Sequence, residues 1–134
     1  MASIHKEIVI DAKPDDVWAA LADFGALHTR LATGFVTDTR LEPGAAARIV
    51  TFSNGSTARE LLVTKDDARR RLVYAVAANE RITQHSASVQ VFAEDAERSR
   101  FVWIADVLPN EIGSYIDEQM ELGAGFIKQT LERR

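Results

Sequence analysis

The chain has 134 residues, 46% of them hydrophobic and 27% charged, and it is expected to fold as a single domain, 1–134. Its net charge of -4 argues against a nucleic-acid or anionic-membrane surface, because both need a concentrated basic patch. The absence of cysteine excludes disulfides and thiol nucleophiles and fits a cytoplasmic location, and no segment is apolar enough for membrane insertion.

The first third of the chain predicts one strand and two short helices. Residues 4–10 alternate apolar and polar side chains, which indicates a half-buried strand. Pro14 suits the first turn of a helix, where a missing N–H costs nothing, and the acidic residues that follow it complement the positive helix terminus. This helix is expected to end at Gly25, and residues 26–31 predict a second short helix.

From Gly34 onward the apolar residues recur with a period of two, which is typical of strands. Asn54-Gly55 predicts a hairpin, because the type I′ turn needs positive φ at both central residues. The short connections imply an antiparallel meander. With residues 4–10 the chain has seven expected strands, and the other six are 35–42, 46–53, 58–65, 72–77, 84–93 and 100–108.

The last predicted element is a long amphipathic helix that begins at Pro109. Gly123 and Gly125 lie in its middle, at a cost of roughly 1 kcal/mol each relative to alanine, and allow either close packing or a bend. Because the sheet needs a cover for its apolar face, we expect it to curve around this helix and enclose a small-molecule cavity. The apolar face of the helix contains Ile112, Ile116, Met120, Gly123, Ile127 and Leu131.

This order of elements resembles the helix-grip fold. The segment Pro14-Asp15-Asp16-Val17-Trp18, with Leu21-Ala22-Asp23-Phe24 after it, resembles the entry motif of the START-like (SRPBCC) superfamily, as do Arg59-Glu60-Leu61-Leu62 and residues 103–109. The superfamily includes the polyketide cyclase/dehydrase and lipid-transport group. The likeness implies an α+β fold of START/Bet v 1 type, with a seven-stranded antiparallel sheet around a long C-terminal helix and two short helices after the first strand. By resemblance, members bind apolar small molecules, and a minority catalyse cyclisation or dehydration.

A more distant resemblance, to plant abscisic-acid receptors, orients the strands. There the glutamate at the position of Glu60 points into the pocket, and a tyrosine corresponds to His85. Strand alternation then gives the other inward side chains, whereas the inward face of strand 100–108 stays open and Trp103 is assigned to the core. The expected ligand-binding residues are Ile49, Thr51, Glu60, Leu62, Tyr74, Val76, His85, Ala87, Val89, Ile116, Met120, Gly123 and Ile127.

Glu60 and His85 are the candidate catalytic residues. A carboxylate that faces an apolar cavity must be paired, hydrated or protonated. Glu60 could therefore accept a hydrogen bond from a ligand hydroxyl or act as a general base. The alternative is an exposed glutamate or one paired with Arg59 or Arg81. His85 could transfer a proton or polarise a carbonyl, or could be an ordinary core or rim histidine. No cofactor is expected, and without cysteine or a His-x-x-x-His pattern no metal site either.

Three functions remain open on these residues. The first is binding of a hydrophobic small molecule, such as a lipid or polyketide, between the sheet and the C-terminal helix. The second is a polyketide cyclase or dehydratase that uses Glu60 and His85 as an acid–base pair. The third is a collapsed cavity of a water or two, with an outer surface that binds an unknown protein partner. The polar strand near Thr37 favours a monomer.

Overall fold

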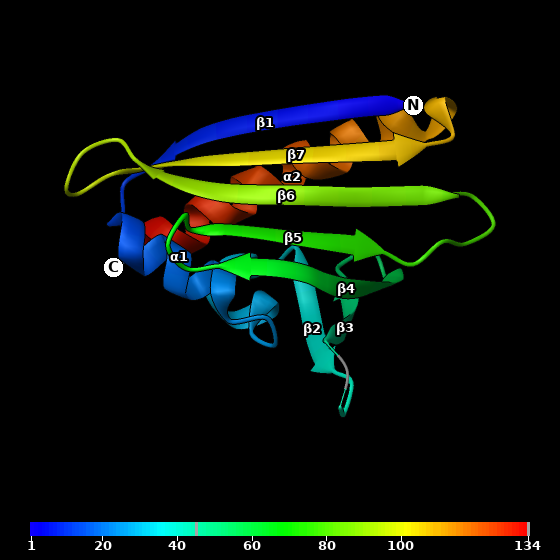
Figure 1. The fold of residues 1–134 in the computed structure, drawn as a ribbon, viewed down its shortest axis with the longest axis horizontal. Coiled ribbons are helices and arrows are strands. Elements are labelled where there is room, and N and C mark those ends of the chain that lie inside the picture. The colour runs from blue at the N-terminus through cyan, green and yellow to red at the C-terminus, as the bar shows by residue number, and fades with distance from the viewer. Residues whose placement is uncertain (45, 134) are drawn as a thin grey trace.

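The computed structural model describes residues 1–44 and 46–133, and it confirms the predicted α+β helix-grip architecture (Figure 1). One antiparallel sheet has the strand order β1-β7-β6-β5-β4-β3-β2. Its strands are β1 (Ala2–Ile10), β2 (Val36–Leu41), β3 (Ala47–Phe52), β4 (Thr57–Asp66), β5 (Arg71–Val76), β6 (Gln84–Ala93) and β7 (Ser99–Leu108). The helices are α1 (Pro14–Ala22), a π-helical turn (Leu27–Leu31), a 3-10 turn (Asn110–Ile112) and α2 (Gly113–Glu132).

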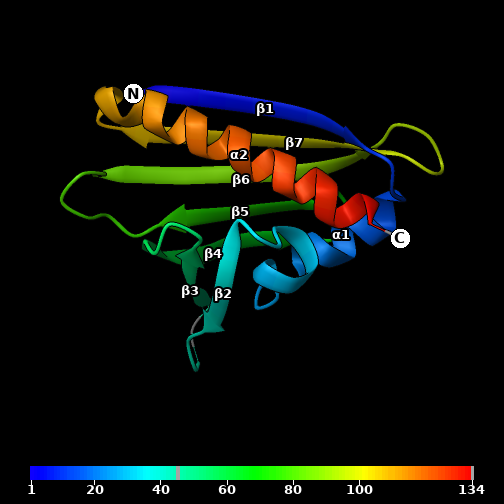
Figure 2. The same cartoon turned by 180° about the vertical axis from the view of Figure 1, so that it is seen from behind.

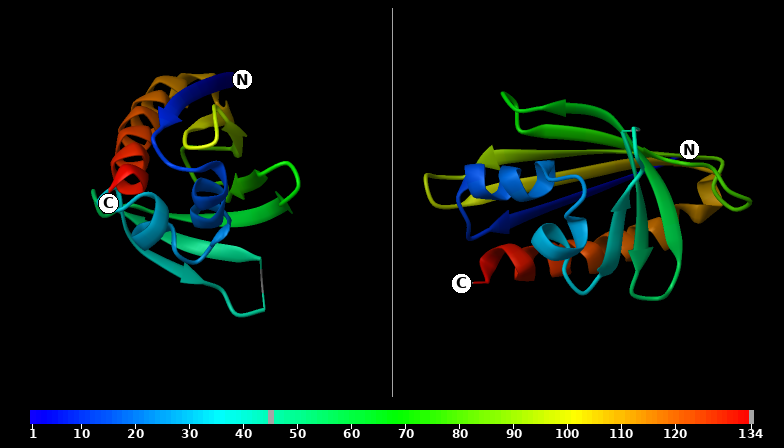
Figure 3. Two further views of the ribbon diagram at one scale, coloured as in Figure 1. Left: turned by 90° about the vertical axis from the view of Figure 1, so that its left-hand side faces the viewer. Right: turned by 90° about the horizontal axis from the view of Figure 1, so that it is seen from below.

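The sheet curls around α2, which crosses its concave face (Figure 2). Figure 3 shows the curl end on, with β2 and β3 turned away from the direction of the other strands. The register shifts between Leu62 and Thr64 on β4 and between Val36 and Asp38 on β2. Such bulges bend a strand and increase its twist, which brings the far edge of the sheet around towards the helix.

Helix α1 and the π-helical turn lie beside the C-terminal half of α2 (Figure 2). Val17 and Leu21 are buried on α1, and Trp18 donates its indole N–H to Asp67 on the β4–β5 turn at 3.0 Å. This helix ends at Ala22, earlier than the predicted end at Gly25. No helix among the described residues is long and apolar enough to cross a membrane.

The two glycines of α2 have different surroundings. A Cβ atom on Gly123 would lie 3.2 Å from the Phe35 ring and 3.4 Å from the Trp103 ring. A Cβ atom on Gly125 would meet nothing within 4 Å. Close packing is therefore the role of Gly123, and Gly125 faces open space.

The β3–β4 hairpin differs from its predicted form by one residue. Its loop contains residues 53–55, and Gly55 alone in this loop has positive φ, at 88°. A two-residue turn would have placed Ile49 opposite Glu60, whereas the three-residue loop places Arg48 there. Because opposed side chains share a face and a one-residue slip reverses it, Arg48 turns inward and Ile49 outward.

Candidate functional site

A cavity of about 260 Å³ lies between the concave face of the sheet and α2. At about 30 Å³ per water molecule in the liquid, it corresponds to roughly nine waters. It is therefore much larger than the pocket of a water or two that a collapsed interior predicts. Its wall includes residues from α1, the π-helical turn, α2 and all strands except β1.

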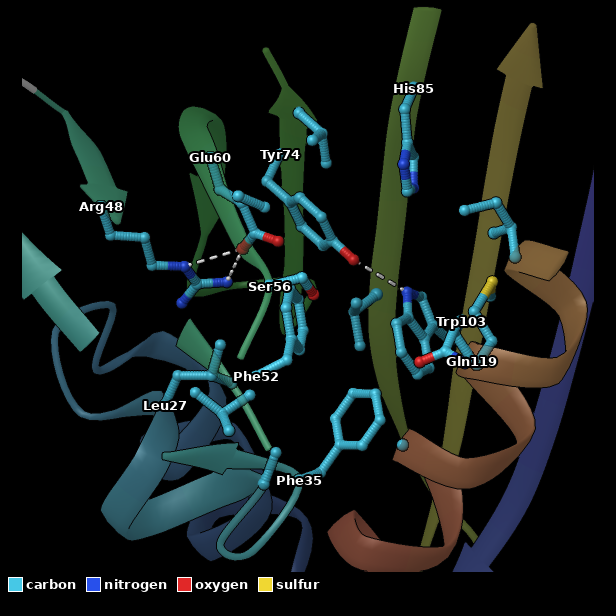
Figure 4. A pocket seen from close by; sticks show the side chains of 18 of the residues that line it. Leu27, Phe35, Arg48, Phe52, Ser56, Glu60, Tyr74, His85, Trp103 and Gln119 are labelled. Atoms are coloured by element: carbon cyan, nitrogen blue, oxygen red, sulfur yellow. Dashed lines mark hydrogen bonds and ion pairs between the residues drawn. The ribbon is translucent and has the colours of Figure 1, made fainter. Parts of the chain in front are cut away.

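Most of the wall is apolar, with the phenyl rings of Phe35 and Phe52 gathered towards one end (Figure 4). Phe35 packs edge to face on Phe52, with ring centroids 5.5 Å apart, and stacks on Phe126 at 6.0 Å. Leu27 lies on the same side of the cavity in Figure 4. Large rings of this kind supply most of the contact area in a small-molecule site.

A buried ion pair forms the polar side of the cavity. Arg48 on β3 donates from Nε to Oε1 of Glu60 on β4 at 2.9 Å, and its Nη2 forms an ion pair with the same oxygen at 2.8 Å. Arg48 and Glu60 are only 5% and 6% exposed. Burial raises the pKa of the Glu60 carboxyl, and the Arg48 guanidinium opposes that rise. Glu60 is thus a desolvated carboxylate that depends on one cation.

The Arg48 side chain is fixed on its other side as well. Its Nη1 donates to the carbonyl oxygen of Phe24 at 3.1 Å, and its guanidinium stacks over the Phe24 ring at 3.9 Å. Neither of the two arginines named in the alternative for Glu60 pairs with it. Arg59 pairs with Glu42 on the outer face at 2.7 Å, and Arg81 is exposed at the rim of the cavity.

A second polar pair crosses the floor of the cavity. Trp103 on β7 donates its indole N–H to the Tyr74 hydroxyl on β5 at 3.1 Å, across β6 (Figure 4). Burial raises the pKa of the Tyr74 phenol, so the hydroxyl keeps its proton. Since its oxygen already accepts from Trp103, the Tyr74 O–H proton is available to a bound molecule.

His85 on β6 lines the same cavity. Burial lowers its pKa, which favours the neutral imidazole near pH 7, and no described group hydrogen-bonds its buried Nδ1 atom. Glu60 and His85 lie on strands separated by β5, so their backbones are two strand spacings, about 10 Å, apart. No hydrogen bond joins them among the described residues, and a direct proton relay between them has no support. Within residues 1–44 and 46–133, no three His, Asp or Glu side chains gather as metal ligands.

A comparison with protein families decides where this architecture belongs. The model of the polyketide cyclase/dehydrase and lipid transport family matches residues 1–133. The chain belongs to this family. No curated protein matches the chain.

Solved structures of other proteins share the fold of this family member. An uncharacterised protein from Bacillus thuringiensis has a TM-score of 0.86 at 17% identity, over 98% of this chain and 100% of that one. A START superfamily protein from Mycobacterium smegmatis has a TM-score of 0.78 at 11% identity, over 97% of each chain. The di-domain ARO/CYC BexL of the BE-7585A biosynthetic pathway has a TM-score of 0.79 at 14% identity, over 98% of this chain and 47% of that one.

Nine of the thirteen residues expected to bind a ligand line the cavity of this family member. Four others do not. Ile49 and Thr51 lie on the opposite face of β3, because the hairpin register differs by one residue. Leu62 packs against the core beside the bulge of β4, and Ala87 is buried opposite Tyr74 without lining the cavity. The nine are Glu60, Tyr74, Val76, His85, Val89, Ile116, Met120, Gly123 and Ile127.

Sequence reasoning missed several cavity residues, and Arg48 is the most consequential of them. The signal for Arg48 was present, since an inward Glu60 needs a partner and cross-strand neighbours supply one. Trp103 was assigned to the core but lines the cavity, which shows that the face of β7 with Trp103 is the one that points inward. Nothing in the sequence pattern indicated that Phe35 and Phe52 line the cavity, because only the curl of the sheet brings them opposite α2.

Proposed function

We propose that this family member binds a compact apolar small molecule in the cavity between the sheet and α2. The observation that carries the proposal is an apolar enclosure of about 260 Å³ into which a few polar groups converge. Glu60, Tyr74 and His85 are those groups. An apolar wall with few orienting polar groups is the usual composition of a small-molecule site.

The size of the cavity narrows the class of ligand. Pockets for drug-sized molecules begin at about 300 Å³, and this cavity lies slightly below that limit. A compact ring system therefore suits it better than a long acyl chain. The aromatic end formed by Phe35 and Phe52 offers such a ring both a face and an edge for packing.

Native mass spectrometry of the purified protein, repeated after denaturation, tests the proposal. We expect an apolar mass that is bound in the native state and lost on denaturation. Ala58 lines the cavity, so Ala58→Phe should displace that mass, whereas Ala75→Phe makes the same change on a strand position outside the cavity and should retain it. A wild-type protein that is empty and binds no apolar probe contradicts the proposal.

Acid–base catalysis is the second candidate function, because Glu60 and His85 face one cavity with pKa values shifted by burial. Their separation requires a substrate that spans both groups, since each must lie within hydrogen-bond reach of its proton. The test is exchange of the α-protons of 2-tetralone in D2O, followed by NMR. The binding proposal predicts equal exchange rates with wild type and His85→Gln. Faster exchange with wild type would instead support catalysis.

A further inference from the structure

We infer that the cavity selects neutral ligands that donate a hydrogen bond, such as phenols and alcohols, and rejects ligands that place a carboxylate at Glu60. This inference rests on the proposed function, since it assigns the chemistry of the ligand group that meets the buried ion pair. It makes Glu60 the residue that determines specificity.

The first support is the way Glu60 is bonded. The Arg48 Nε hydrogen bond and the Nη2 ion-pair contact both go to Oε1, and Oε2 accepts no hydrogen bond from the described residues. In Figure 4 the second oxygen points away from Arg48, towards the Tyr74 side of the cavity. A carboxylate oxygen that faces an apolar cavity is a strong hydrogen-bond acceptor. A ligand O–H placed there forms a charge-assisted hydrogen bond with it.

The second support is the balance of charge. Arg48 donates from Nε to Glu60 and from Nη1 to the Phe24 carbonyl, its Nη2 lies 2.8 Å from the same Glu60 oxygen, and the Phe24 ring covers one face of its guanidinium. The pair is therefore neutral as a unit and has no uncompensated positive charge for an incoming anion. A carboxylate at this point would lie beside the open Glu60 oxygen, where like charges repel strongly in a low dielectric.

The remaining charged residue of the wall does not change this balance. Arg81 is exposed at the rim and lies over the Tyr115 ring at 5.5 Å. A carboxylate held there would stay in water, where an ion pair contributes little to affinity. Deep in the cavity, Tyr74 offers one O–H donor and the neutral His85 offers no fixed positive charge.

Titration calorimetry with three probes of one skeleton tests the inference near pH 7. We would use 2-naphthol, which donates a hydrogen bond, 2-methoxynaphthalene, which cannot donate one, and 2-naphthoate, which is an anion. Since a hydrogen bond to a charged acceptor has a large effect, 2-naphthol should bind at least about tenfold more tightly than either other probe. Equal affinities, or tightest binding of 2-naphthoate, would overturn the inference and leave the proposed function standing. Binding of none of the three would overturn both.

A matched pair of variants assigns the preference to Glu60. In Glu60→Gln the amide oxygen can still accept from Arg48 while the amide NH2 group faces the cavity, so the preference for 2-naphthol should disappear and 2-naphthoate should gain affinity. Arg59→Gln changes a neighbouring outer-face residue and should keep the wild-type order of affinities. An unchanged order in Glu60→Gln would overturn the assignment. If Glu60→Gln does not fold, the wild-type order alone decides the inference.

Discussion

Arg48 and Glu60 are each left without a charge partner in a buried position if the other is removed, because both are almost fully buried. Arg48→Met should therefore reduce the free energy of unfolding by about 3–5 kcal/mol, measured by urea denaturation. Arg59 is the residue before Glu60 on β4 and forms an exposed ion pair with Glu42. Arg59→Met should therefore reduce the free energy of unfolding by only about 1 kcal/mol or less. Similar small losses of unfolding free energy in both variants would show that the buried Arg48–Glu60 pair contributes little to stability.

The buried imidazole of His85 should make the free energy of unfolding depend on pH. Burial lowers its folded-state pKa below the ordinary value of 6.5. The contribution of the neutral imidazole is therefore fully present above pH 6.5 and is lost as the pH falls through the folded-state pKa. Surface carboxylates whose pKa values are lowered by hydrogen bonds from arginines titrate in a more acid range.

Urea denaturation at about pH 7.5 and about pH 5.5 measures this effect. The loss of unfolding free energy between the two should be larger for wild type than for His85→Gln, which has no imidazole to protonate. An NMR titration of the His85 ring should give a pKa below 6.5. The same pH dependence in both proteins would exclude His85 as its source.

At the scale of the elements, the two glycines of α2 are a natural comparison. Gly125→Ala meets open space and should stabilise the protein by about 1 kcal/mol, the usual helix-propensity gain. Gly123→Ala places a methyl group 3.2 Å from Phe35, which is itself held between Phe52 and Phe126, so the gain should be cancelled or reversed. Thermal unfolding of both variants measures the difference, and equal stabilisation would show that α2 is not closely packed at Gly123.

The same elements show what the sequence could and could not specify. Alternation predicted seven strands. The resemblance to abscisic-acid receptors pointed Glu60 and His85 inward, and all three of Glu60, Tyr74 and His85 line the cavity. Alternation failed on β3, where both faces contain apolar residues and the turn type alone decides the register. A loop longer by one residue moved the side chains of β3 to the opposite faces, so that Arg48 instead of Ile49 points into the cavity.

At the scale of the molecule, the cavity depends on packing that periodicity does not describe. Two bulges curl the sheet, and only then do side chains distant in sequence, such as Phe35 and Trp103, meet across Gly123. The covering helix was predictable because the sheet needs one. The volume that remains beneath it was not, because it is set by side chains from nearly every element at once.

Titration calorimetry of 2-naphthol with wild type, Ala58→Phe and Ala75→Phe tests most directly whether that cavity binds a ligand. The first substitution fills the space beside Glu60, and the second adds the same ring on the outer face of β5. Circular dichroism would confirm that both variants fold. The account predicts that Ala58→Phe weakens binding at least about tenfold and that Ala75→Phe leaves it unchanged. Equal affinity for all three proteins would place the binding site elsewhere and contradict the account.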